Sequence, residues 1–112
     1  MTRELFYADA ILEALQQEMR RDDRVYVYGE DLGVYGGVFG VTQGLQEEFG
    51  KERIRETPLS EQAILGEAVG SALYGMRPVP EIQFCDFITV CMTQVVDSVS
   101  YTHLRAHETL LD

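Results

Sequence analysis

Apolar residues recur every three or four positions in the stretch LFYADAILEALQQEMRRD near the start of the chain. This spacing predicts an amphipathic helix over roughly residues 5–21. The apolar positions on its one face are Leu5, Ala8, Leu12, Leu15 and Met19. The following VYVY, at residues 25–28, is β-branched and aromatic and stops at a glycine, which predicts a short strand. Glu30 and Asp31 would lie at the carboxyl end of this strand, and the succession of helix and strand predicts an α/β fold.

Residues 33–50 contain six of the ten glycines. We expect a loop as far as Gly40 and then a short helix, capped by Thr42 and ended by Gly50. Neither the G-x-x-x-x-G-K-[ST] nor the G-x-G-x-x-G phosphate-binding pattern occurs here. A tight connection that needs positive φ is therefore favoured over a phosphate cradle, although the glycines alone leave both open.

The stretch TPLSEQAILGEAVGSALYG predicts a helix to about Met76, with Ser60 or Thr57 as its cap. Its sequence is apolar nearly all round, which is typical of a helix buried on most sides. The small residues of the helix form one stripe that another backbone could approach closely: Ala63, Gly66 and Gly70. Because 112 residues can hardly bury such a helix from within, we expect cover from a further part of the protein or from a partner chain.

The stretch RPVPEIQFCDF predicts a second strand over roughly residues 79–85, and Pro78 and Pro80 restrict its start to a sheet edge or an irregular entry. A further helix is predicted from ITVCMTQVVD. The apolar positions on one face of that helix are Ile88, Cys91, Met92, Val95 and Val96.

The composition excludes several classes of protein. The net charge is −10, which argues against nucleic-acid binding, because that requires a positive surface. No apolar run approaches the length of a membrane span, and the start does not resemble a signal peptide. Two cysteines, Cys85 and Cys91, fit reduced thiols and not a disulfide framework or a zinc site. We therefore expect a cytoplasmic protein without a membrane or nucleic-acid partner.

The last stretch, SVSYTHLRAHETLLD, breaks the preceding pattern and contains both histidines. Its SYTHLRAHET resembles a translated sequencing-adaptor tail, so we expect residues 98–112 to be a non-native tail. His103 and His107 stand four residues apart with Glu108 behind them, but the H-E-x-x-H pattern and a third ligand are missing. We expect no metal site in this chain.

Glu61 is a candidate functional residue because it places a carboxylate in the first turn of an otherwise apolar helix. A carboxylate at a helix amino terminus also stabilises the helix by some tenths to about 1 kcal/mol, so a purely structural role is equally compatible with the pattern. In an apolar pocket, desolvation would raise its pKa, and the acid could exchange a proton with a ligand nitrogen.

Four stretches in order, GEDLG, GGVFGVTQGLQEEFG, RIRETPLSEQAILGEAVGSALYGMRPVPEIQFCDFI and MTQVVD, resemble the beta subunit of the thiamine diphosphate-dependent 2-oxo acid dehydrogenases. The TPLSE turn followed by the RPVPEI strand is the most specific part of this resemblance. It implies that residues 1–97 are the N-terminal part of a transketolase-like pyrimidine-binding domain, with a parallel sheet flanked by helices. The beta subunits of this family are much longer than this chain.

The resemblance also implies site residues. Glu61 would hydrogen-bond a ring nitrogen of the aminopyrimidine of thiamine diphosphate and so promote removal of the proton from the thiazolium carbon. Leu59 would line the aminopyrimidine site, Gln83 would contact the cofactor, and Phe87 would pack on the ring. The alternatives are ordinary: Leu59 at a helix start, Gln83 at a solvated strand end and Phe87 in the core. Glu30 matches a family acid to which we assign no role.

The same resemblance implies partners and a reaction. The chain lacks the G-D-G-type motif that binds the diphosphate and its magnesium, so the alpha subunit of a heterotetramer with two alpha and two beta chains would supply it. The reaction would be oxidative decarboxylation of a 2-oxo acid, with pyruvate as the expected substrate, and the acyl group would be transferred to the lipoyl acyltransferase core. The alternatives are a branched-chain 2-oxo acid or acetoin dehydrogenase, a single-chain relative such as transketolase or deoxyxylulose-phosphate synthase, and an inactive truncated fragment.

Overall fold

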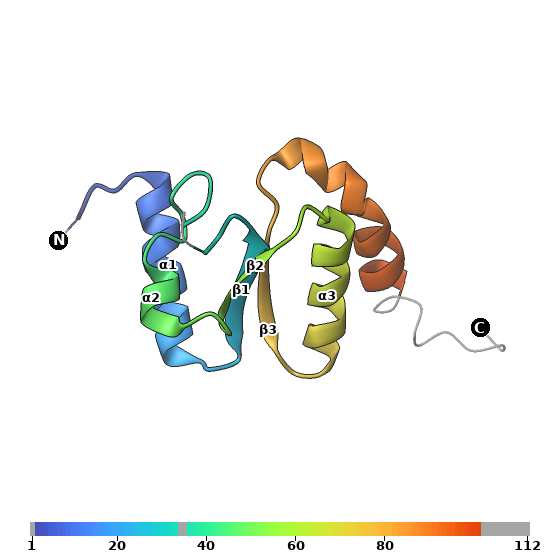
Figure 1. The fold of residues 1–112 in the computed structure, drawn as a ribbon, viewed down its shortest axis with the longest axis horizontal. Helices are drawn as coiled ribbons and strands as arrows, with labels where there is room; N and C mark the ends of the chain where they lie inside the picture. Colours follow the sequence, from blue (N-terminus) through green and yellow to red (C-terminus); the bar gives the residue numbers. More distant parts are fainter. Residues whose placement is uncertain (1, 34–35, 102–112) are drawn as a thin grey trace.

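The computed structural model describes residues 2–33 and 36–101, which form a three-stranded parallel sheet with helices on both faces (Figure 1). The elements in order are α1 (Tyr7–Arg21), β1 (Val25–Glu30), α2 (Leu45–Phe49), β2 (Ile54–Thr57), α3 (Glu61–Leu73), β3 (Arg77–Glu81), the 3₁₀ helix η1 (Cys85–Cys91) and the π-helix η2 (Gln94–Tyr101). The predicted α/β class with a parallel sheet is confirmed. A helix is also present where ITVCMTQVVD predicted one, although it consists of two irregular parts.

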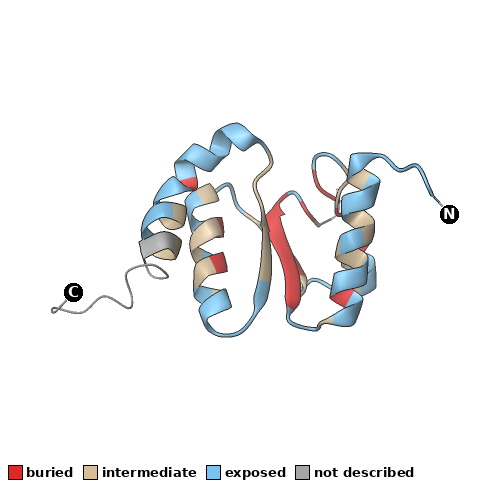
Figure 2. Cartoon of the chain, turned by 180° about the vertical axis from the view of Figure 1, so that it is seen from behind, coloured by how far each residue is buried: buried red, intermediate tan, exposed pale blue. Residues whose placement is uncertain are grey.

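β1 is the middle strand, since the order in the sheet is β2-β1-β3 and both neighbours run parallel to it. All six of its residues are buried, and it forms the centre of the molecule (Figure 2). Successive side chains of a strand point to opposite faces. Val25 and Val27 therefore pack toward α1, whereas Tyr26 and Tyr28 pack toward α3.

The α1 side of the sheet holds the larger core cluster. Its buried members are Met19, Val25, Val27, Leu32, Leu45 and Ile54. Leu12 and Leu15 pack against this cluster, so the apolar face predicted for the first helix is confirmed from Leu12 to Met19. Leu5 is the exception: it precedes α1 and is 46% exposed.

The α3 side is joined to β1 by two tyrosine hydroxyls. Tyr28 donates a hydrogen bond to the Ile64 carbonyl at 2.5 Å, and Tyr26 donates one to Ser71 Oγ at 2.7 Å. Only Ile64 and Ala68 of α3 are buried, and Leu73 is 65% exposed. The burial on most sides that its composition predicts is therefore not supplied by the described part of the chain.

The small-residue stripe of α3 is used at one position. A methyl group added at Gly66 would lie 3.5 Å from the Gln94 side chain of η2, whereas one added at Gly70 would have no neighbour within 4 Å. The neighbour at Gly66 is thus a side chain at ordinary contact distance, and the close approach of another backbone that the stripe predicted is not found among the described residues.

β2 is an element that the sequence pattern did not predict. Its residues IRET carry charges at two of four positions and alternate weakly. The strand forms because it pairs in parallel with β1 and because the side chain of Ile54 is buried. Arg53 strengthens this contact by donating hydrogen bonds to the carbonyls of Met19, Asp22 and Val25, which connect the end of α1 and the start of β1 to β2.

β3 begins and ends earlier than the predicted 79–85, at Arg77 and Glu81. The Arg77 amide donates to the Arg24 carbonyl at 2.9 Å, so residues 77, 79 and 81 direct their backbone groups toward β1. Pro78 and Pro80 consequently face away from β1, on a side where the described sheet has no further strand. The edge position that these prolines predicted is confirmed, because a proline there sacrifices no hydrogen bond to β1.

The loop before α2 has the positive φ that its glycines predicted, at Gly36, Gly37, Gly40 and Gly44. Gly50 ends α2 as expected, but the predicted cap is wrong. The helix begins only after Gly44, and Thr42 lies in the preceding loop, with a buried side chain.

Candidate functional site

The carboxyl ends of the three parallel strands form the candidate site, which we call the carboxyl edge. Ligands of open α/β sheets bind at such ends. Glu30, Thr57 and Glu81 are the last residues of β1, β2 and β3, and Glu61 is the first residue of α3. Three carboxyl groups therefore lie at this edge, where the strands end and α3 starts.

Glu30 is the buried member of this group, with only 3% of its surface exposed. Its Oε1 accepts a hydrogen bond from the Ser60 amide at 3.3 Å, and its Oε2 is buried without a hydrogen-bond partner among the described residues. Burial, and then the negative charge of Glu61, raise the pKa of Glu30, and the Ser60 amide opposes them. The carboxyl group of Glu61 is thus close enough for its charge to act on Glu30.

Glu61 lies half-buried beside a shallow groove of about 580 Å³. The other residues of the groove are Ser60, Gln62, Ala63, Gly66, Val90 and Gln94. The prediction of an apolar pocket is therefore only partly correct, because the described residues leave the groove open and line it with several polar side chains. Ser60 precedes α3 as predicted, but its hydroxyl donates to the Pro58 carbonyl at 3.1 Å and does not cap the helix.

Gln83 lies two residues beyond β3 and not within a strand. Its Nε2 donates to the Glu30 carbonyl and to Asp31 Oδ2, each at 3.2 Å. Gln83 therefore ties the segment after β3 to the end of β1. Whatever else it contacts, it is a structural part of the carboxyl edge.

Leu59 and Phe87 are exposed, at 80% and 39%. Phe87 does not belong to the core, so that alternative for it is wrong. Its ring contacts Phe84 edge to face, with centroids 5.6 Å apart, and Phe84 contacts Phe39 in the same manner at 5.7 Å. Three exposed aromatic rings from two distant segments consequently lie in a row.

Glu81 is the site residue that the sequence pattern missed. The predicted strand 79–85 placed it mid-strand, whereas it ends β3, with Oε2 buried and without a partner among the described residues. Burial, and then the charge of Glu30, raise the pKa of its carboxyl. The available signal in the sequence was the pair of prolines just before Glu81, since prolines favour a short strand.

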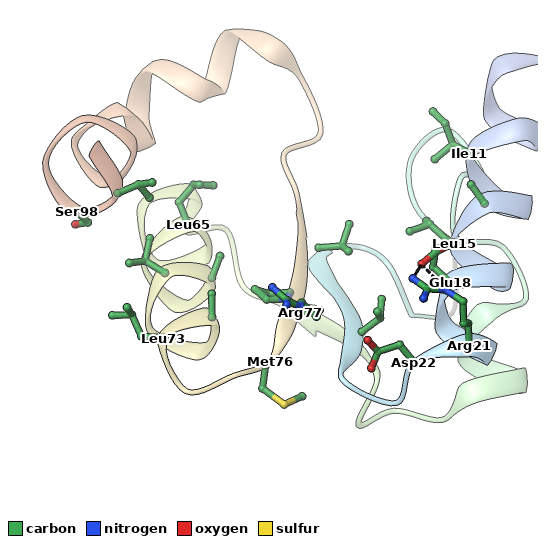
Figure 3. Close-up of a pocket in the computed structure, with 18 residues that line it drawn as sticks. Ile11, Leu15, Glu18, Arg21, Asp22, Leu65, Leu73, Met76, Arg77 and Ser98 are labelled. Carbon is green, nitrogen blue, oxygen red and sulfur yellow. Dashed lines mark hydrogen bonds and ion pairs between the residues drawn. The ribbon is translucent and has the colours of Figure 1, made fainter. Parts of the chain in front are cut away.

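A second and larger hollow lies elsewhere. It is a groove of about 830 Å³ that runs between α1 and α3 past β3, and we call it the apolar groove (Figure 3). Aliphatic side chains make up most of its wall, including Ile11, Leu15, Leu65, Leu73 and Val79. None of the three carboxyl groups of the carboxyl edge lines it. The site is therefore identified by its chemistry and not by its volume.

Within the described residues, 2–33 and 36–101, no three His, Cys, Asp or Glu side chains are grouped as metal ligands. No helix in this part of the chain has both the length and the apolar character of a membrane span. His103 and His107 lie outside the described residues, as does most of the predicted tail, which stays a prediction.

Sequence comparisons agree with the arrangement of these elements. The chain is 50% identical over 101 residues to the 2-oxoisovalerate dehydrogenase subunit beta of Bacillus subtilis, which covers 90% of this chain and 31% of the relative. It is 50% identical over 97 residues to the pyruvate dehydrogenase E1 component subunit beta of Staphylococcus epidermidis, covering 87% of this chain and 30% of the relative. For the protein of that name from Bacillus subtilis the identity is 53% over 91 residues.

The chain thus spans about 30% of the length of these curated relatives. Residues 3–109 match the family described as transketolase, pyrimidine binding domain, which includes all the described strands and the carboxyl edge. With almost its whole length inside that match, the chain belongs to the transketolase pyrimidine-binding domain family.

Proposed function

We propose that this chain is the aminopyrimidine-binding part of the beta subunit of a thiamine diphosphate-dependent 2-oxo acid dehydrogenase. The observation that carries the proposal is the pairing of Glu61, at the start of α3, with the buried Glu30 at the end of β1. The names of the relatives support the class of reaction.

The residues at the carboxyl edge fit such a cofactor. Within the described part of the chain, Glu30 Oε2 is buried without a hydrogen-bond partner and Glu61 lies beside an open groove, so hydrogen-bonding capacity is left over at the end of the sheet. Leu59 and Phe87 present exposed apolar surface after β2 and β3. We propose that Glu61 hydrogen-bonds the aminopyrimidine ring, that Leu59 and Phe87 contact its faces, and that Gln83 fixes the end of β1 beneath it.

The electrostatics assign Glu30 a task within this scheme. Its raised pKa favours the neutral form, and a neutral carboxyl can donate a hydrogen bond to the Glu61 carboxylate. Such a bond would hold the Glu61 side chain in one orientation and place a proton next to it. When bound, thiamine diphosphate supplies the electron sink for loss of carbon dioxide from a 2-oxo acid.

We propose pyruvate as the substrate and a branched-chain 2-oxo acid as the alternative. The two relatives with 50% identity have names of these two kinds, so the identities do not separate them. The partners would be an alpha subunit that supplies the diphosphate and magnesium site, in a heterotetramer of two alpha and two beta chains, and a lipoyl acyltransferase core. The exposed apolar residues Leu59, Phe84 and Phe87 support a surface that another chain or the cofactor covers.

The decisive experiment replaces the Glu61 equivalent by Gln in a full-length relative that is assembled with its alpha subunit. A lost proton-transfer group lowers rates by roughly 10²–10⁴-fold. We therefore expect kcat for decarboxylation to fall by about this factor while the heterotetramer stays assembled.

The control is Glu67→Gln, six residues further along α3. Glu67 makes a long, exposed contact to Arg55, at 3.8 Å, and lies outside the carboxyl edge. Its replacement should leave kcat within about twofold of wild type. Equal rates for Glu61→Gln and wild type would refute the role of Glu61.

The chain as it stands has a separate test, because a piece of a subunit need not bind the cofactor. Isothermal titration with thiamine diphosphate, combined with size-exclusion chromatography, separates the cases. We expect no activity of the isolated chain. A discrete species that binds the cofactor would contradict the alternative that the chain is an inactive fragment.

A further inference from the structure

Glu81 lies on the opposite face of the sheet from the Glu30–Glu61 pair. Val79, two residues before it on β3, packs in the α1-side core, and residues two apart on a strand share a face. Glu30 instead points toward α3, where it accepts the Ser60 amide. The charge of Glu30 nevertheless reaches Glu81 because the two residues end neighbouring strands.

Gly29 makes room for Glu81. It is the register partner of Glu81 in the β1–β3 pair. A methyl group added at Gly29 would lie 2.9 Å from the Glu81 carbonyl oxygen and 3.0 Å from its Cβ. The missing side chain therefore allows the end of β3 to lie tightly against β1.

Residues 36–44, the glycine segment, come close to Glu81. A methyl group added at Gly37 would lie 3.2 Å from Thr42 Oγ1 and 3.8 Å from Glu81 Oε1. Thr42 is only 2% exposed, and its Oγ1 has no hydrogen-bond partner within the described residues. Thr42 Oγ1 and Glu81 Oε1 thus lie near the same small space, and the other carboxyl oxygen of Glu81, Oε2, is buried without a partner among the described residues.

Backbone contacts hold the glycine segment at this place. The Gly37 amide donates to the Asp31 carbonyl, and the Thr42 amide donates to the Gly36 carbonyl, each at 3.0 Å. These two amides connect the segment to the end of β1 and to itself. They therefore report on whether the segment is closed over Glu81.

We propose that Glu81 is a positioning residue whose carboxyl, opposite the Thr42 hydroxyl, holds the glycine segment against the strand ends and couples it to the Glu30–Glu61 pair on the other face. The coupling to Glu61 rests on the proposed function. The contact that we propose between Glu81 and the glycine segment does not rest on it. A neutral carboxyl group has an O–H that can donate a hydrogen bond to a hydroxyl oxygen.

The surroundings of Glu81 favour this neutral form. The ion pairs of the described residues do not include Glu81. The charge that acts on it is that of Glu30 at the end of β1, which is itself an acid. Ionisation of Glu81 would therefore remove the donor and add repulsion, which would loosen the glycine segment.

The test is amide hydrogen exchange of the full chain between about pH 5 and 8, read at Gly37 and Thr42 and corrected for intrinsic exchange. The neutral population of an acid falls tenfold per pH unit above its pKa. We expect wild-type protection to fall by up to about tenfold per unit once Glu81 ionises. Glu81→Gln, which keeps the shape and a donor, should show protection that does not depend on pH.

Two further variants sharpen the outcome. Glu52→Gln removes the same charge at an exposed site and should exchange like wild type. Thr42→Val removes the hydroxyl and should abolish the difference between wild type and Glu81→Gln, as expected for a direct contact. Parallel pH profiles for wild type and Glu81→Gln, or unfolding of Glu81→Gln, would overturn the proposal. Because no cofactor is added, these results do not depend on the proposed reaction.

Discussion

The carboxyl edge and the apolar groove differ in what they leave unsatisfied. The apolar groove is the larger of the two hollows, and three of the charged side chains in it have partners, since Arg21 pairs with Glu18 and Asp22 pairs with Arg24. The carboxyl edge is shallow, but the buried polar atoms without partners in the described residues lie there: Glu30 Oε2, Thr42 Oγ1, Thr57 Oγ1 and Glu81 Oε2. A large apolar hollow thus indicates core surface that is left uncovered, whereas buried polar atoms without partners indicate a place where chemistry can occur.

This difference has an energetic reason. Uncovered aliphatic surface costs only about 25 cal/mol per Å², and the chain can tolerate it. A buried carboxyl without a partner costs more, and folding retains it only where something else depends on it. Substitutions at the two places should therefore act in different ways.

The largest expected effect comes from crowding the carboxyl edge. Gly29→Ala would bring a methyl group to within 2.9 Å of the Glu81 carbonyl oxygen, and the neighbour is backbone that cannot rotate away. Overpacking of this kind costs roughly 1–3 kcal/mol. Urea unfolding should show a loss of stability in this range.

Gly70→Ala is the matched control, since a methyl group there meets nothing within 4 Å. In the middle of a helix it should stabilise the chain by roughly 0.5–1 kcal/mol. If both variants changed the stability in the same direction, the tight contact between Gly29 and Glu81 would be disproved.

A smaller effect, of opposite sign, is expected for Glu30→Gln. Burial and Glu61 raise the pKa of Glu30 above that of the unfolded chain, so its ionisation opposes folding. The penalty is absent below the unfolded pKa of about 4.3 and grows with rising pH until it is complete above the folded pKa. The variant should therefore be more stable than wild type at pH 8 and equal to it at about pH 4.

Urea unfolding at a series of pH values measures this difference in stability. We expect the free energy of unfolding to differ by about 1.4 kcal/mol for each unit by which the pKa of Glu30 is raised. Glu56→Gln, at an exposed position of β2, should show no such pH-dependent gain. A Glu30→Gln variant that is less stable than wild type at pH 8 would mean that the ionised carboxylate supports the fold.

The smallest effect is expected in the apolar groove. Leu73 is 65% exposed, so Leu73→Gln should change the free energy of unfolding by no more than about 0.5 kcal/mol. It should lower self-association, because it removes part of an exposed apolar surface. Sedimentation velocity and urea unfolding test both points, and a loss above about 1 kcal/mol would show that the groove is already closed in solution.

Local patterns predicted the strongly periodic and glycine-rich parts of this fold. The first helix, the strand after it and the helix after Ser60 were predicted close to their observed positions because each buries a local apolar pattern. β2 was missed because its IRET pattern is weak, and the pairing with β1 that creates it lies 27 residues away in register, as between Val27 and Ile54. Thr42 looked like a cap, but the positive φ of Gly44 delays α2 beyond its reach.

For the candidate site, the sequence by itself determined that an acid begins α3 and that an acid follows the buried strand β1, since both are local features of helix starts and strand ends. Only the tertiary structure decided that the charge of Glu61 acts on the buried Glu30 and that Glu81 lies beside Glu30 on the other face of the sheet. These encounters depend on the parallel pairing of three strands that are distant in sequence. No local pattern encodes such a pairing, because its hydrogen bonds form only when the strands meet.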